Sequence, residues 1–202
     1  MWMSAYSKQT HAAANQSAGG VADAAQARRI RMRRLAMNGL FLAMALVLSV
    51  LERWIPVQAV IPIPGVKLGL ANIITLFILF YADWVDAAVV STLRCLLAAF
   101  AFAGLSSLLF SLSGAALALP AMMLAKRFYP SRVSLIGISI SGAAAHNLGQ
   151  LGMAALTMRS AAVFGYAPVL SGAALVMGTL TALVAIPFFR AMEGTGLVKS
   201  HT

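Results

Sequence analysis

Charged side chains, and acidic ones above all, are scarce in this chain. Only five of its 202 residues are Asp or Glu, and charged residues of both signs make up 10% of the sequence, against 61% hydrophobic residues. A soluble domain of this size would lack the polar side chains needed to cover its surface. The composition therefore excludes an ordinary soluble domain and predicts a protein that lives in lipid.

The shortage of reactive side chains also restricts the chemistry. Asp83 and Asp86 are the only closely spaced acidic pair, whereas an enzyme that holds a diphosphate through magnesium needs clustered aspartates. The single cysteine, Cys95, cannot form an intrachain disulfide, and no second His or Cys lies at ligand spacing from His146 within its apolar segment. We therefore expect no catalytic site, no metal site and no cofactor.

The N-terminal segment lacks the long apolar run of a cleavable signal peptide. It is rich in Ala, Ser, Gln and Gly, and it holds too few large apolar side chains to offset the entropy of ordering it. We expect residues 1–34 to be a disordered, basic cytoplasmic tail. A second short cytoplasmic tail is expected at residues 191–202.

The rest of the chain is a series of apolar runs. A membrane-spanning helix needs roughly 20 mostly apolar residues, and several such runs follow the five-arginine cluster that ends at Arg34. Prolines 56, 62 and 64 with Gly65 interrupt them and predict an outer loop at residues 57–65. We predict an all-α integral membrane protein in which residues 35–190 form a bundle of about six transmembrane helices, near residues 35–54, 67–82, 85–103, 108–125, 133–157 and 169–189.

Basic residues on alternating sides give this bundle an orientation. With the N-terminus inside, eleven Lys and Arg residues fall on the inner side, and only Arg53, Lys67 and Arg159 on the outer side. Positive charge in short loops marks the cytoplasmic face. We therefore predict a multi-pass protein of the cell inner membrane with both termini in the cytoplasm. The basic residues behind the net charge of +10 are explained by the orientation of the protein in the membrane, so no nucleic-acid partner is expected.

Small residues recur four positions apart within the runs, a spacing that lets helix backbones approach closely. The pairs are Gly39/Ala43, Gly114/Ala118 and Gly178/Ala182. They indicate either packing within the bundle or a docking face for another membrane subunit. The first helix, with Ala36, Gly39 and Ala43, is the best candidate for docking.

Charges inside or beside the spans need a partner or a polar cavity. Arg94 sits near the middle of the third expected span, where burial costs at least roughly 2.5 kcal/mol. It either forms a structural ion pair, with Glu52 as the best candidate, or binds an anionic ligand. Lys67, at the outer start of the second span, is either an ordinary interfacial lysine or part of an anion site at a helix N-terminus.

Polar amides gather on two of the expected helices. His146 and Gln150 share one helix face with i, i+4 spacing, and Asn147 stands three residues from Gln150. Asn72 adds an amide to the second helix. These groups serve interhelical hydrogen bonding, line a ligand cavity, or, for His146, take part in metal binding or proton relay.

The combination of these segments resembles a known family. The segments that carry the resemblance are Glu52, Ile-Pro-Gly-Val-Lys-Leu-Gly-Leu-Ala-Asn at residues 63–72, Arg94, Ser-Leu-Ser-Gly at residues 111–114, His-Asn-Leu-Gly-Gln at residues 146–150, and Pro168. Together they resemble the Gx transporter family, also called the heptaprenyl diphosphate synthase component I family. That family is similar to the substrate-binding S components of energy-coupling factor transporters.

The two family names imply different functions. The transporter name implies a membrane subunit that captures a small, anionic or amphipathic metabolite through Lys67, Asn72, Arg94, His146, Asn147 and Gln150. The chain has no Gly-x-x-x-x-Gly-Lys-Ser/Thr motif, so the energy would come from separate ATPase subunits and a coupling membrane subunit. The synthase name implies a non-catalytic membrane component associated with polyprenyl diphosphate synthesis. In neither case is the chain expected to be an enzyme by itself.

Overall fold

The structure is a computed structural model that describes residues 2–55, 67 and 70–194, with the backbone alone at residues 2–22 and 188–194. The chain divides into two compact units, residues 1–40 and residues 41–202. The expected outer loop at residues 57–65 and most of the C-terminal tail lie outside the described residues.

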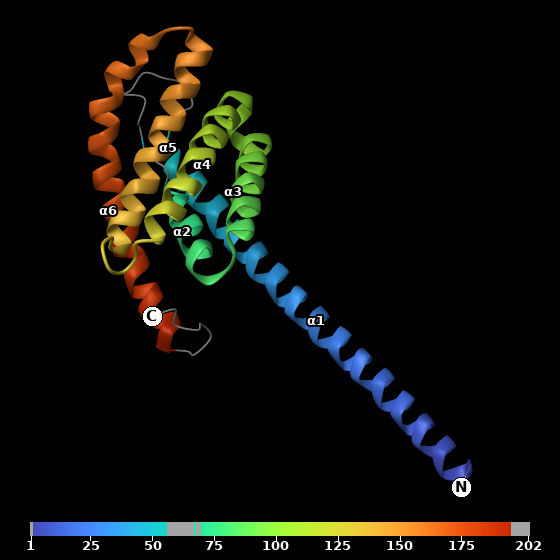
Figure 1. Ribbon diagram of the computed structural model, residues 1–202. Helices are drawn as coiled ribbons and strands as arrows, with labels where there is room; N and C mark the ends of the chain where they lie inside the picture. The colour runs from blue at the N-terminus through green and yellow to red at the C-terminus, as the bar shows by residue number, and fades with distance from the viewer. Residues whose placement is uncertain (1, 56–66, 68–69, 195–202) are drawn as a thin grey trace. The chain divides into compact units, whose positions relative to one another are not determined.

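The described residues form helices joined by turns and short loops, without a strand, which confirms the predicted all-α class. A π-helical segment, η2 (Ala99–Ala103), and a 3₁₀ helix, η3 (Ala161–Tyr166), lie between the longer elements (Figure 1). The α-helices are α1 (Trp2–Glu52), α2 (Asn72–Tyr81), α3 (Trp84–Ala98), α4 (Gly104–Lys126), α5 (Leu135–Met158) and α6 (Ala167–Gly194).

Three stretches of the described chain are long and apolar enough to cross a membrane, namely Asp23–Glu52, Trp84–Lys126 and Ala161–Pro187. The second stretch contains both α3 and α4, which lie side by side because the chain turns back at η2 and Gly104 (Figure 1). Gly104 has a φ of 80°, a conformation that a residue with a Cβ adopts only at a cost. The count of six spans and the orientation of the termini remain predictions.

Two expected boundaries differ from the structure. Residues 2–34, which we expected to be disordered, belong to α1; this segment is rich in alanine, the strongest helix former. The second helix begins at Asn72 rather than near Lys67. With its 10 residues, α2 is shorter than a full membrane span.

Helix α5 packs between α4 and α6 (Figure 1). A Cβ on Gly149 of α5 would lie 2.3 Å from the backbone oxygen of Ser113 in α4, and a Cβ on Gly178 of α6 would lie 2.7 Å from the Cα of Ile140 in α5. At both contacts, glycine lets two backbones touch. These contacts hold α4, α5 and α6 at fixed distances from one another.

The close contacts decide between packing and docking for two of the three small-residue pairs. Gly114 lies against the ring of His146, and its partner Ala118 is buried. Gly178 packs on α5, and Ala182 is also buried. Both pairs therefore serve packing within the bundle.

The first-helix pair has a different environment. Gly39 has no atom within 4 Å of its Cβ position, and Ala36, Gly39 and Ala43 are exposed. Their role as a docking face for another subunit stays a prediction.

The apolar core of the unit that begins at residue 41 forms around α2. Almost every side chain of α2 is buried, from Asn72 to Leu79. The ammonium of Lys126, at the end of α4, donates to the carbonyl oxygen of Leu79 and stands 4.7 Å from the ring centroid of Phe80. A cation at a helix C-terminus satisfies carbonyls that have no partner within the helix. Lys126 therefore fastens the end of α2 to α4.

Candidate functional site

Lys67 lies five residues before α2 and is held by two other helices. Its backbone N–H donates to Oε1 of Gln150 in α5 at 3.1 Å, and its ammonium donates to Oγ of Ser111 in α4 at 3.3 Å. These contacts join positions 83 and 44 residues apart in the chain. The Lys67 side chain is thereby directed toward α4, and its backbone is held by α5.

Gln150 continues the chain of hydrogen bonds to His146. Its Nε2 lies 3.0 Å from Nε2 of His146. Because an amide nitrogen can only donate, His146 accepts through Nε2 and carries its proton on Nδ1. Gln150 is 0% exposed and His146 2% exposed, and the imidazole rests on Gly114, where an added Cβ would force the ring to move. The predicted shared face of His146 and Gln150 is thus confirmed.

Arg94 is buried in α3, with 4% of its surface exposed. One terminal nitrogen donates to Oγ of Ser49 in α1 at 3.3 Å, and the other to Sγ of the neighbouring Cys95 at 3.5 Å. Its Nε is buried without a hydrogen-bond partner among the described residues. A buried guanidinium with an unused donor has capacity for one further acceptor.

Electrostatic interactions join Arg94 to the other polar groups. The charges of Glu52 and Arg94 both act on Lys67, and those of Arg94 and Lys67 both act on His146. Glu52, at the end of α1, is itself buried. We call Lys67, Arg94, Ser111, His146 and Gln150 the Lys67 cluster. An ion pair between Glu52 and Arg94 stays a prediction, although both residues act on the same ammonium.

The two predicted asparagines take different places. Asn72 is buried at the first position of α2, and its Nδ2 has no hydrogen-bond partner within the described part of the chain. Asn147 donates to the carbonyl oxygen of Leu170 in α6 at 2.8 Å. It therefore points toward α6, about 100° around the helix from His146. No contact of the described residues brings either asparagine into the Lys67 cluster.

Hydroxyl groups complete the polar interior. Ser49 holds Arg94, Ser111 holds Lys67, and a hydrogen bond of 3.0 Å between Thr75 and Ser91 joins α2 to α3. The only sequence signal for them is a small polar residue within an apolar helix, which is common in membrane bundles.

Two cavities lined by described residues lie outside this cluster. A small one of about 70 Å³ lies between α5 and α6 beside Asn147 and Leu170. A larger one of about 400 Å³ lies between the start of α3 and the second half of α4. The described residues contain no group of three or more His, Cys, Asp or Glu side chains that could hold a metal ion.

Comparison with known proteins identifies a family. The family described as heptaprenyl diphosphate synthase component I matches the chain over residues 41–188. No curated protein and no solved structure matches the chain. The matched range includes the whole Lys67 cluster and all helices from α2 to α5.

Proposed function

The chain belongs to the heptaprenyl diphosphate synthase component I family, and we propose that it is the membrane-embedded substrate-binding subunit of a small-molecule transporter. The observation that carries the proposal is the convergence of two cations, the buried Arg94 and the partly buried Lys67, on one cluster of uncharged hydrogen-bonding groups. The two cations come from different segments of the chain, and both act on His146.

The balance of charge in this cluster favours an anionic substrate. Lys67 and Arg94 carry two positive charges, and Glu52 is the acidic residue that acts on Lys67. Burying like charges in an apolar bundle is costly unless an anion neutralises them. Arg94 Nε and Asn72 Nδ2 are both buried donors without partners among the described residues. A ligand with carboxylate or phosphate oxygens would supply the missing acceptors.

The energy for transport would come from other subunits, because the sequence contains no phosphate-binding Gly-x-x-x-x-Gly-Lys-Ser/Thr loop. We propose separate ATPase subunits and a coupling membrane subunit, as in transporters whose S components this chain resembles. The exposed small residues Ala36, Gly39 and Ala43 of α1 would dock on the coupling subunit, since small residues let another helix approach closely.

The family description favours a second candidate, a membrane component of polyprenyl diphosphate synthesis. In that case the chain would act with a separate catalytic subunit, because Asp83 and Asp86 are its only closely spaced acidic residues. The Lys67 cluster would then hold the diphosphate of a substrate or product.

Native mass spectrometry of the protein extracted from its own membrane tests both candidates. The transport proposal predicts a bound small anion together with ATPase subunits and a second membrane subunit. Recovery with a soluble prenyl diphosphate synthase, and without ATPase subunits, would overturn the transport proposal in favour of the second candidate. A protein recovered without any bound small molecule or partner would overturn both.

A further inference from the structure

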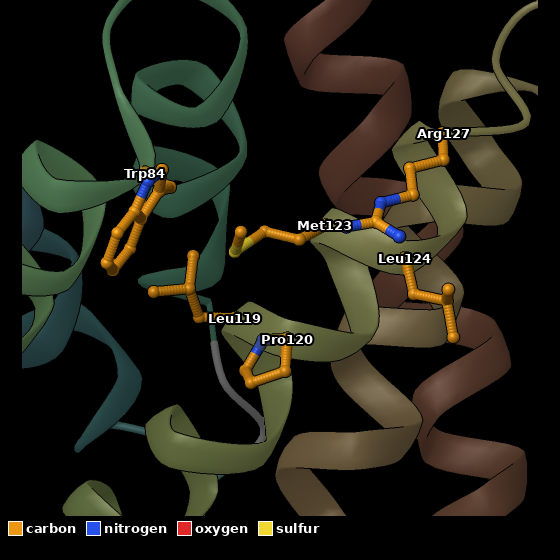
Figure 2. Close-up of a pocket in the computed structure, with 6 residues that line it drawn as sticks. All are labelled: Trp84, Leu119, Pro120, Met123, Leu124 and Arg127. Atoms are coloured by element: carbon orange, nitrogen blue, oxygen red, sulfur yellow. The ribbon is translucent and has the colours of Figure 1, made fainter.

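The larger cavity shares no lining residue with the Lys67 cluster and is mostly apolar. Its volume is about 400 Å³, within the range of small-molecule sites. Figure 2 shows Trp84 and Arg127 at opposite ends, with the side chains of Leu119 and Met123 directed toward Trp84. We call it the α3–α4 groove; its lining residues are Trp84, Leu119, Pro120, Met123, Leu124 and Arg127.

The sequence explains why a groove forms at this point. Leu119 and Met123 stand four residues apart, on one face of α4. Pro120 lies within α4, where it lacks the N–H that would bind the carbonyl of Ala116 and so weakens the helix locally. Trp84 is 57% exposed and Leu124 58% exposed. The groove therefore presents apolar side chains outward, toward the surroundings of the bundle.

Arg127 gives this apolar groove a charged end. The neighbouring Lys126 is already engaged with the end of α2, whereas Arg127 lines the groove and is exposed. A planar guanidinium binds a phosphate through two parallel hydrogen bonds. The groove thus combines an apolar channel with a phosphate-binding group at one end.

We propose that the α3–α4 groove binds an anionic phospholipid of the surrounding membrane. The lipid phosphate lies on Arg127, and one acyl chain lies along Leu119, Met123 and Trp84. Arg127 belongs to the loop that the charge distribution assigns to the cytoplasmic side, where a basic group near the surface attracts anionic headgroups. Trp84 is the type of residue that lies at the membrane interface. The site is independent of the Lys67 cluster.

Quenching of Trp84 fluorescence by brominated lipids tests the proposal. Trp2 and Trp54 are first replaced by phenylalanine, which leaves Trp84 as the only tryptophan. The full-length protein is then reconstituted in phosphatidylcholine vesicles with increasing fractions of acyl-brominated phosphatidylglycerol. We expect stronger quenching than with brominated phosphatidylcholine at the same fraction. Arg127→Gln should lower the apparent affinity for phosphatidylglycerol about fivefold.

Arg132→Gln is the matched control, because it removes the same charge from an exposed residue of the same loop that does not line the groove. Its affinity for phosphatidylglycerol should fall less than that of Arg127→Gln, because Arg132 can attract the headgroup only from outside the groove. Equal quenching by the two brominated lipids, or an equal loss in both variants, would overturn the proposal. Absence of quenching by either lipid would mean that a protein segment covers the groove and would also overturn it.

Discussion

Replacement of Gly149 by alanine should separate α4 from α5. The new Cβ would lie 2.3 Å from the carbonyl oxygen of Ser113, where ordinary contacts begin near 3.4 Å. The two backbones must therefore move apart by about 1 Å, because the clash is with backbone and not with the end of a flexible side chain. Overpacking of this kind costs about 1–3 kcal/mol. For a chain of this size we expect the unfolding temperature to fall by about 2–12 °C.

Gly152 provides the matched control for this substitution. It lies one turn further along α5, and no atom lies within 4 Å of its Cβ position. Alanine favours helix over glycine, so Gly152→Ala should leave the unfolding temperature unchanged or slightly raised. Both variants are measured by thermal unfolding in the same detergent. If Gly149→Ala is as stable as Gly152→Ala, the close contact between α4 and α5 is wrong.

Two further predictions concern the ends of the helices. Lys126→Met removes the ammonium from the Leu79 carbonyl and the Phe80 ring, and should lower the free energy of unfolding by about 1–2 kcal/mol. The control Arg132→Met, at an exposed residue, should leave the free energy of unfolding unchanged. Equal stability of the two variants would refute the role of Lys126. Because Cys95 is buried, a membrane-impermeant maleimide applied to intact cells should label Arg159→Cys and not Arg132→Cys. The reverse pattern, or labelling of both, would contradict the predicted orientation.

The helices were the most predictable feature of this chain, because each apolar run ends at a proline, a glycine or a charge. The predicted third and fifth spans, residues 85–103 and 133–157, nearly coincide with α3 plus η2 and with α5. The shared face of His146 and Gln150 was predictable for the same reason, since residues four apart on a helix must lie together.

The partners across helices were not predictable, because they depend on packing between segments far apart in the sequence. Spacing alone placed Asn147 beside Gln150, but its bond to the Leu170 carbonyl turns it toward α6. Lys67 was expected at the first turn of a helix, whereas it precedes α2 and reaches Ser111 and Gln150 instead. Periodicity describes one helix at a time and contains no information about which helix comes next to it.

The binding of an anion at Arg94 and Lys67 is the central claim, and Arg94→Ala tests it most directly. The measurement is the equilibrium affinity for the small molecule recovered with the native protein, made on variants whose thermal unfolding shows that they are folded. A hydrogen bond to a charged group contributes about 1.5–3 kcal/mol, so we expect the affinity of Arg94→Ala to fall about 10- to 150-fold. Arg159→Ala, at an exposed residue, should bind like the parent. Unchanged affinity in a folded Arg94→Ala protein would contradict the account.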